Sequence, residues 1–417
     1  MTDNGDNALG IYISIPFCRS KCTYCNFASG VFPVSDHIPY VNRLIEDLSR
    51  ARAWADEVGA DLPRRVDTIY FGGGTPSLLA PDLLAQLFSA IRGEFDLDAN
   101  AEITVECAPG QVADATLEAM VAAGVNRVSL GVQSFVDSEA HASGRLHSRV
   151  IVEQDLWRLR AAGIANLNLD LIAGLAGQTF ASWEESLEAL VDSEVPHASV
   201  YMLEVDEDSR LGRELLKRGA RYRADLVPHD DAIAHMYERA IERLEESSLC
   251  QYEISNFARP EFESKHNLRY WRRRPYLGVG LDALSMLVVH AAPVWNGSGD
   301  QTKPTDVLRF TATDDLKAYL AGSIAPEITR LSPAQQHEEA WFLGLRLNQG
   351  VDIGALRQEF SLELVAPAIE TVERLVDAGL LVANGGRVCL TSRGRLISND
   401  VFQEFLAPEV ATAACAQ

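Results

Sequence analysis

Three cysteines on one short segment constrain this chain more than any other feature. Cys18, Cys22 and Cys25 stand in the spacing C-x3-C-x2-C, directly after residues 11–15, whose β-branched and aromatic side chains predict a buried strand. Zinc sites normally combine two such knuckles, and no second one follows downstream. Three thiolates can instead hold an iron–sulfur cluster, and a four-iron cluster held by three of them keeps one iron open for another ligand.

Composition limits the class of protein. The 417 residues suggest two or three domains, and the seven cysteines, an odd number, do not read as a disulfide framework, which favours a cytoplasmic protein. The polar N-terminus does not resemble a signal peptide, and no apolar run approaches the roughly 18 residues of a membrane span. The net charge of −22 argues against a general nucleic-acid binder. Arg269, Arg272, Arg273 and Arg274 are the best candidates for a local basic patch.

Short apolar runs alternate with helix-like stretches from residue 12 to about residue 205. The runs are residues 11–15, 68–71, 102–106, 127–131, 166–172 and 197–203, and the helical stretches include 39–58, 81–91, 114–123, 150–162 and 182–193. Gly59, Gly124 and Gly163 stand where a helix would end in a glycine cap. This alternation predicts parallel βα units, and six of them make an α/β fold of the open, partial (β/α)6 barrel type.

We expect three domains. Residues 1–205 would form the barrel core, and residues 206–330 an extension that completes the barrel. Residues 331–417 would form a winged-helix-like domain, with helices at 333–347, 352–360 and 366–378 and then a hairpin that turns at residues 384–386. Winged helices often bind DNA, but the acidic chain makes this one a better candidate for a lid or docking module.

Polar or glycine-rich residues follow each predicted strand. In parallel barrels the chemistry sits at the carboxyl ends of the strands. The first strand is followed by the cysteine loop, and the second by Gly72, Gly73, Gly74 and Thr75. The third ends in Glu106, the fourth in Gln133 and Ser134, the fifth in Asp170 and the sixth in Glu204. Arg145 and His147 lie on the loop after the fourth strand. Each signal is weak alone, but their location together predicts one ligand site.

These stretches resemble the HemN-type branch of the radical S-adenosylmethionine (SAM) superfamily, and in detail its HemW-like haem chaperones. The matching segments are IYISIPFCRSKCTYCNF, IYFGGGTPSLL, ITVECAPG, GVNRVSLGVQSF with GRLH, LNLDLIAGLAGQT, and YEISNFA followed by KHNLRYW. The resemblance implies that Cys18, Cys22 and Cys25 ligate a [4Fe–4S] cluster whose open iron is chelated by SAM.

The resemblance also implies a set of residues that contact SAM. They are Tyr12, Tyr24, Gly73, Gly74, Thr75, Glu106, Gln133, Arg145 and Asp170. Glycine backbone would meet the methionyl amino group, while Gln133, Arg145 and Asp170 would hydrogen-bond carboxylate and ribose. The cluster would reduce SAM to methionine and a 5′-deoxyadenosyl radical, and the protein would orient the cofactor and exclude water.

His266, in the segment His266-Asn267-Leu268-Arg269-Tyr270-Trp271, has two interpretations. A histidine among aromatic residues is most simply a buried core residue. In HemW-like proteins, however, the HNxxYW signature is associated with haem, so the resemblance implies that His266 ligates haem iron. Arg272, Arg273 and Arg274 would then pair with the haem propionates, or else are solvated charges.

Two departures from the family pattern bear on function. Phe27 stands where the coproporphyrinogen dehydrogenases of this branch carry a fourth cysteine, and Leu284 stands where a histidine is usual. Phe27 favours a haem chaperone that delivers haem to haemoproteins, including one in a membrane. The alternative is an oxygen-independent coproporphyrinogen III oxidase or another radical SAM enzyme of tetrapyrrole metabolism, which the complete SAM site supports. Whether the chain dimerises stays open.

Overall fold

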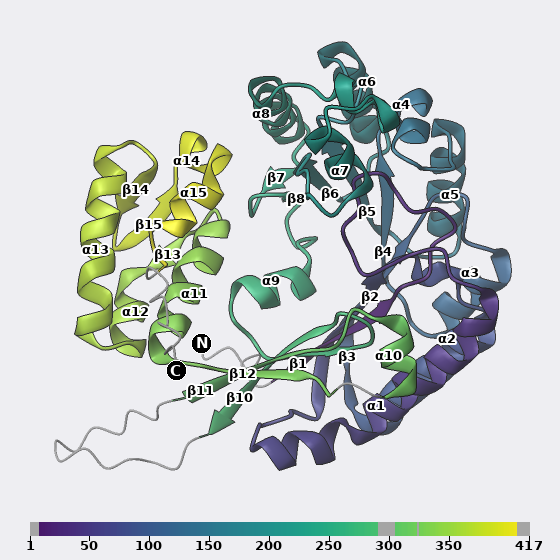
Figure 1. Cartoon of the computed structure of the whole chain (residues 1–417), viewed down its shortest axis with the longest axis horizontal. Helices are drawn as coiled ribbons and strands as arrows, with labels where there is room; N and C mark the ends of the chain where they lie inside the picture. Colours follow the sequence, from purple (N-terminus) through teal and green to yellow (C-terminus); the bar gives the residue numbers. More distant parts are fainter. Residues whose placement is uncertain (1–7, 291–304, 323–324, 407–417) are drawn as a thin grey trace, which may run out of the picture. The chain divides into compact units, whose positions relative to one another are not determined.

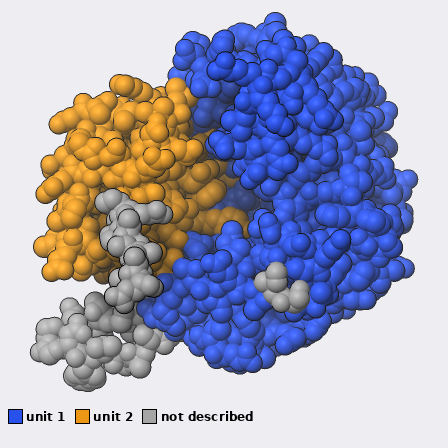
Figure 2. Space-filling model, in the orientation of Figure 1, with its two compact units in different colours: residues 1–251, 255–269, 274–330 blue, residues 252–254, 270–273, 331–417 orange. Residues whose placement is uncertain are grey.

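The structure, a computed structural model, describes residues 8–290, 305–322 and 325–406. It divides into two compact units, which Figure 2 colours separately. Unit 1 comprises Met1–Gln251, Ser255–Arg269 and Arg274–Arg330, and unit 2 comprises Tyr252–Ile254, Tyr270–Arg273 and Leu331–Gln417. The three domains that the sequence suggests, with a boundary at residue 205, stay a prediction.

One twelve-stranded sheet forms the framework of unit 1 (Figure 1). Its parallel centre follows chain order: β1 (Leu9–Ile15), β2 (Arg65–Gly73), β3 (Asp96–Cys107), β4 (Arg127–Gln133), β5 (Asn166–Ala173) and β6 (His197–Met202). Beyond β1 the sheet continues with the parallel β9 (Tyr276–Val279), then β10 (Leu284–His290), β11 (Thr305–Thr311) and β12 (Glu327–Leu331). Beyond β6 it continues with antiparallel β8 (Asn256–Ala258) and β7 (Cys250–Gln251).

Helices connect these strands and cover the outer face of the curved sheet (Figure 1). The helices up to residue 321 are α1 (His37–Val58), α2 (Pro81–Glu94), α3 (Asp114–Ala122), α4 (Asp137–Ala142), α5 (Arg149–Ala161), α6 (Phe180–Asp192), α7 (Arg210–Leu216), α8 (Asp230–Glu246), α9 (Lys265–Trp271) and α10 (Leu316–Ala321). Of these, α9 lies on the inner side of the curved sheet and does not cover its outer face (Figure 1). The predicted open, partial (β/α)6 barrel is therefore confirmed. Gly59, Gly124 and Gly163 have φ of 71°, 83° and 90°, the left-handed conformation of a helix cap. None of the helices in the described ranges has both the length and the apolar character of a membrane span.

Along the barrel strands, apolar side chains on one face alternate with mostly polar side chains on the other. Ile11, Ile13 and Ile15 of β1 are fully buried and belong to the apolar layer under the helices. The residues between them and their register partners on the other face are mostly polar: Tyr12, Ser14, Thr68, Tyr70, Glu102, Thr104, Glu106, Arg127, Ser129, Asn168, Asp170, His197 and Ser199. The hydrophobic core of unit 1 thus lies between sheet and helices, and the inner face of the sheet is a polar surface.

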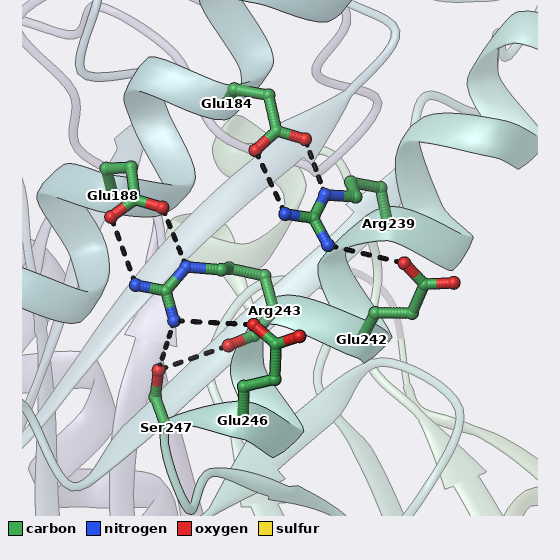
Figure 3. A network of polar contacts seen from close by, with 7 residues as sticks. All are labelled: Glu184, Glu188, Arg239, Glu242, Arg243, Glu246 and Ser247. Atoms are coloured by element: carbon green, nitrogen blue, oxygen red, sulfur yellow. Dashed lines mark hydrogen bonds and ion pairs between the residues drawn. The ribbon is translucent and has the colours of Figure 1, made fainter.

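Helix α8 packs against α6 through an apolar stripe with ion pairs beside it (Figure 3). The stripe consists of Ile233, Met236, Tyr237, Ala240 and Leu244, all buried. Beside it, Arg239 donates to Glu184 over 2.6 Å and Arg243 donates to Glu188 over 2.7 Å.

Unit 2 is helical with a small sheet. It contains α11 (Pro333–Arg346), α12 (Ile353–Glu359), α13 (Leu362–Asp377), α14 (Ser392–Leu396) and α15 (Ser398–Gln403), with a sheet of β13 (Val351–Asp352), β15 (Arg387–Leu390) and β14 (Leu381–Asn384). Trp341 is fully buried and stacks on Phe405, with ring centroids 4.6 Å apart. Gly385 and Gly386 turn the hairpin with φ of 58° and 82°. Helices followed by this hairpin give the predicted winged-helix-like arrangement, although α13 begins four residues before the predicted start at residue 366.

We expect the apolar stripe of α8, not its ion pairs, to hold the helix in place. Leu244→Ala should lower the free energy of unfolding by about 3 kcal/mol, since it leaves a cavity in a packed interior. Arg243→Met should lower it by less than about 1 kcal/mol, because ion pairs with a solvent-exposed partner such as Glu188 contribute little and the aliphatic stem is kept. Urea denaturation of both variants measures the difference. Equal losses of unfolding free energy in the two variants would show that the ion pairs contribute as much as the apolar stripe to the packing of α8.

Candidate functional site

The three clustered cysteines lie on the loop between β1 and the short 3-10 helix Val34–Asp36. Cys18, Cys22 and Cys25 are half-buried and form no disulfide. The loop is closed by backbone hydrogen bonds, because Cys18 N donates to Gly30 O over 2.8 Å and Gly30 N donates to Pro16 O over 2.9 Å. All three thiols are thereby held on one small, structured surface at the carboxyl end of β1.

The three thiols are close enough to influence one another electrostatically. Burial raises the pKa of Cys18, and the neighbouring Cys25 and Cys22 raise it further. Within the described ranges, no group of three or more His, Cys, Asp or Glu side chains is arranged so that it could hold a single metal ion. A four-iron cluster binds each thiolate at a different iron, so it suits thiols that share a loop without meeting at one point.

A glycine turn at the end of β2 borders the cysteine loop. Gly74 N donates to Ile15 O and Thr75 N donates to Phe17 O, both over 2.8 Å. A Cβ on Gly74 would lie 2.8 Å from Ile15 O, so only glycine fits this close approach. Gly73 has φ of 98°, and a Cβ there would lie 3.0 Å from Ser14 Oγ. The turn therefore presents bare backbone to the inner face of the barrel, as a ligand cradle requires.

Tyr12, Tyr70 and Glu106 lie together beside this turn. Tyr70 donates its hydroxyl to Glu106 Oε1 over 2.8 Å, and the Tyr12 and Tyr70 rings stack with centroids 6.1 Å apart. Burial raises the pKa of Glu106 to about 7, although the hydrogen bonds from Tyr70 and Gly73 oppose this. Burial also raises the pKa of both tyrosines. Glu106 is thus a carboxyl group that exchanges its proton near neutral pH.

Arg145 lies on the loop after α4, and its guanidinium group lies beside Gly131 near the end of β4. Its Nη2 donates to the Tyr24 hydroxyl over 3.3 Å. The same atom lies close to Gly131, because a Cβ added at that glycine would be 2.8 Å from it. The Nε of Arg145 is buried and has no partner in the described structure. Burial lowers the pKa of Arg145, but the neighbouring Tyr24, Cys22 and Asp170 outweigh it and raise the pKa overall. Gln133 is buried nearby with a left-handed φ of 71°, which a side chain adopts only under constraint. A buried, partly unpaired guanidinium beside the cysteine loop fits an anionic ligand.

Asp170 is oriented by a network that the sequence did not indicate. Asn168 donates to Asp170 Oδ1 over 2.7 Å, and Ser129 donates to Asp170 Oδ2 over 3.2 Å. Asn168 is held in turn by His197, whose Nδ1 lies 2.6 Å from Asn168 Oδ1, and by Ser199 over 3.3 Å. The alternation of Asn166, Asn168 and Asp170 with leucines was a visible signal that these polar residues share one face.

His266 lies deeper than the other predicted site residues. It is 1% exposed, its Nδ1 is 2.9 Å from Thr68 Oγ1, and its ring stacks on Tyr70 with centroids 5.2 Å apart. Glu102 fixes it further, because it accepts the backbone N–H of His266 over 3.1 Å. Burial, and then the nearby Arg269 and Arg127, lower the pKa of His266 to about 3, so the ring is neutral. In this arrangement it is a core histidine, and haem ligation by it stays a prediction.

Two of the four arginines at residues 269–274, the best candidates for a local basic patch, are already paired within the protein. Arg269 is buried and donates to Ala8 O and Pro275 O over 2.8 and 3.0 Å, with an ion pair to Asp67. Arg273 forms an ion pair with Glu359 through two hydrogen bonds, of 2.7 and 2.8 Å. Both of its Nη atoms are therefore already occupied by a carboxylate and do not face a propionate. The sequence showed the charges but not the acids that meet them from distant segments.

The remaining predicted residues differ in how near they lie to the site. Thr75 is buried, with its Oγ1 4.0 Å from the sulfur of Cys18. His147 is buried, and burial together with Arg145 lowers its pKa to about 4. Glu204 is exposed beyond the end of β6. The structure therefore brings the cysteines, the glycine turn, Arg145 and the predicted carboxyl groups of β3 and β5 to one end of the barrel.

Comparisons with known proteins agree with this arrangement. The radical SAM superfamily profile matches residues 12–190 and the HemN C-terminal domain profile matches residues 331–397. The heme chaperone HemW of Lactococcus lactis is 32% identical over 404 residues, which cover 96% of this chain and 97% of that protein. HemW of Escherichia coli is 30% identical over 410 residues, which cover 96% and 98%. Coproporphyrinogen III oxidase (HemN) of Escherichia coli has the same fold, with a TM-score of 0.76 and 23% identity over 96% of this chain and 90% of that one.

The raised pKa of Glu106 predicts a pH dependence of stability. A carboxyl whose folded pKa is about 7, above its ordinary value of 4.5, holds its proton better in the folded state, so the free energy of unfolding should fall as pH rises from about 4.5 to about 7. Glu106→Gln keeps an acceptor for Tyr70 and removes this titration. Relative to the unmodified protein, it should gain about 2.5 kcal/mol of stability between pH 5 and pH 8. Denaturation at both pH values, with the exposed Glu153→Gln as control, measures this; equal pH slopes in all three proteins would contradict it.

Proposed function

Because this chain belongs to the HemW family of the radical SAM superfamily, we propose that it is a haem chaperone that binds a [4Fe–4S] cluster, SAM and haem and delivers haem to haemoproteins. Membership of the superfamily implies the cluster and SAM. The observation that carries the proposal is the loop of three free, half-buried thiols beside the glycine turn and Arg145. Haem and its delivery come from the names of the relatives.

Cys18, Cys22 and Cys25 would hold the cluster, which supplies single electrons to bound SAM. The SAM site would be the polar end of the barrel around it. The unpaired Nε of Arg145 can donate to a carboxylate, and the bare backbone of Gly73 and Gly74 leaves room for the amino acid part of the ligand.

Two carboxyl groups would act differently in this site. Asp170 is fixed by Asn168 and Ser129, so it can accept hydrogen bonds from the ligand's hydroxyl groups without reorganising. Glu106, with a pKa near 7, can hold or release a proton at its carboxyl beside the glycine turn. The Tyr12 and Tyr70 rings, which stack beside Glu106, would help to exclude water from its carboxyl group.

The haem part of the proposal rests on His266 and its neighbours. Since the His266 ring is buried against Tyr70 and Thr68, ligation of haem iron requires the ring to leave this pocket. Trp271 has a buried, unpartnered Nε1 in the described structure, while the Arg346 guanidinium lies over its ring at 4.2 Å. We further propose that the chain works in the cytoplasm, that its acceptor is a haemoprotein, including one in a membrane, and that a dimer is one possible working form.

The second candidate is an oxygen-independent coproporphyrinogen III oxidase. The shared HemN fold and the complete set of SAM residues favour it. One residue counts against it: Phe27, which is 65% exposed, stands where the enzymes of that branch carry a cysteine. Under anaerobic conditions with dithionite and SAM, vinyl products from coproporphyrinogen III would establish the enzyme, and stable haem retention without decarboxylation would establish the chaperone.

Cys22→Ser should abolish the cluster. A serine oxygen is a poor substitute for a thiolate at iron, and two cysteines cannot hold four irons. After anaerobic reconstitution we expect the iron and sulfide content and the visible absorbance to fall to a small fraction of the unmodified protein. Cys250→Ser is the matched control, because Cys250 is exposed on β7 and should leave both unchanged. Full cluster content in Cys22→Ser would refute the assignment.

His266→Ala should weaken haem binding at least about tenfold while leaving the cluster in place, because it removes the only imidazole of the HNxxYW segment. Thr68→Val is the matched control: it removes the hydroxyl 2.9 Å from His266 Nδ1 but keeps the ring. Haem titration of both variants separates the explanations. Equal weakening by both would mean that His266 acts through the packing of α9, and unchanged affinity in His266→Ala would make it a core residue only.

A further inference from the structure

One row of side chains on the inner face of the barrel is left without partners. Thr104 on β3 is in register with Arg127 on β4, and Arg127 is in register with Asn166 on β5. Thr104 Oγ1, Arg127 Nε and Asn166 Oδ1 are all buried and have no hydrogen-bond partner in the described structure. We call these three residues the unpaired row. It lies one step nearer the amino ends of the strands than Glu106 and Ser129, and it contains none of the residues predicted to contact SAM.

Arg127 carries a buried charge that no acid of the described chain neutralises. Its side chain is 1% exposed, and among the described residues its guanidinium forms no hydrogen bond and no ion pair. An unpaired charge is expensive to bury, so buried arginines are normally matched by a carboxylate. Arg269, which is 2% exposed, follows this rule, because it is paired with Asp67. Arg127 is the exception that calls for an anion from outside the chain.

The carboxylates on the inner face of the barrel are held by other donors. Glu102 accepts two backbone N–H groups at the start of α9, both over 3.1 Å. Glu106 accepts the Tyr70 hydroxyl over 2.8 Å, and Asp170 accepts from Asn168 over 2.7 Å. In the described structure none of these acids forms an ion pair with the unpaired row. A negative charge for the row therefore has to come from a ligand.

The guanidinium of Arg127 faces the same interior as two buried histidines. Burial lowers the pKa of His197 on β6, and the charge of Arg127 lowers it further. His266 on α9 is affected in the same way, by burial first and then by Arg269 and Arg127. Both rings are therefore neutral, so neither competes with Arg127 for an anion. The positive charge of Arg127 thus reaches side chains from both β6 and α9.

Access to the unpaired row depends on α9. The His266 ring stacks on Tyr70, with ring centroids 5.2 Å apart, and Tyr70 is the register partner of Thr104. Figure 1 shows α9 on the inner side of the curved sheet. A His266 ring that leaves this pocket, as ligation of haem iron requires, would vacate space next to the unpaired row.

We propose that Arg127 and Thr104 form a carboxylate site inside the barrel, which takes one propionate of the bound tetrapyrrole. The inference rests on the proposed function, since it requires haem binding. A guanidinium offers a carboxylate two parallel N–H donors, and a hydroxyl adds a third donor. The arginines of the HNxxYW region are weaker candidates for this contact, because Arg269 and Arg273 already pair with carboxylates of the chain.

The test compares haem with its dimethyl ester, in which both propionates are neutral. Arg127→Met keeps most of the side-chain volume and removes the charge, Arg127→Lys keeps the charge, and Thr104→Val removes the hydroxyl. Arg52→Met is the matched control, because Arg52 also has a buried, unpartnered nitrogen in the described structure but lies on α1. The full-length protein, loaded with cluster and SAM, is titrated with each ligand in the same detergent. The ligand-free proteins are also unfolded with urea.

We expect Arg127→Met to weaken haem binding at least about tenfold and to leave binding of the ester unchanged, because only haem carries the charge that the guanidinium meets. Arg127→Lys should recover part of this loss, and Thr104→Val should weaken haem binding about threefold. Without haem, Arg127→Met should be at least as stable as the unmodified protein, since it removes an unpaired buried charge. Arg52→Met should bind both ligands as the unmodified protein does.

Unchanged haem affinity in Arg127→Met would overturn the proposal. Equal losses of affinity for haem and its ester would also overturn it, because Arg127 would then act through packing. A clear loss of stability in ligand-free Arg127→Met would mean that the guanidinium is a structural group, satisfied within the fold or by water. If acetate stabilises the ligand-free unmodified protein but haem and its ester bind alike, the row is a site for a small free anion only. No haem binding by the unmodified protein would instead overturn the proposed function, and with it this inference.

Discussion

Burying polar side chains on the inner face of the barrel is the constraint on which the rest of this structure depends. Each buried polar group left without a partner costs about 1–3 kcal/mol, so the inner residues must satisfy one another. Many of them do so in chains that cross several strands, as Asn168 shows by contacting Ser129, Asp170 and His197, although Thr104 Oγ1 and Arg127 Nε have no partner in the described structure. Because these chains lock side chains before any ligand arrives, the same bonds that stabilise the barrel also preorganise its open end.

The elements of the fold were predictable because their signals are local. Hydrophobic periodicity gave the six parallel strands, the glycine caps gave the ends of three helices, and cysteine spacing located the loop that follows β1. Helix α4 was missed because its six residues are too few to show a period. Polar residues at strand ends were also visible, since parallel strands all finish at one edge of the sheet.

Contacts between distant segments were not predictable in the same way. The hydrogen bond between Thr68 and His266 joins residues 198 positions apart, and the ion pair of Arg273 with Glu359 joins residues 86 positions apart. Sequence spacing does not predict contacts between such distant residues. The sequence therefore could not decide whether His266 and the arginines after it bind a ligand or contact other residues of the protein. The motif itself was recognisable, but its burial depended on where α9 enters the barrel. Fold likeness to HemN does not settle the matter either, because one fold supports different functions.

An open sheet has two edges, and each is a template on which a strand of another molecule can add. Here one edge is β7, which ends after two residues. The other is β12, where Glu327, Thr329 and Arg330 are exposed. A short edge and a charged edge both discourage strand addition, so the barrel can remain unclosed without recruiting a second copy edge to edge. Any self-association of this chain would then have to use side-chain surfaces, and would respond to changes in surface residues more than to changes in the sheet.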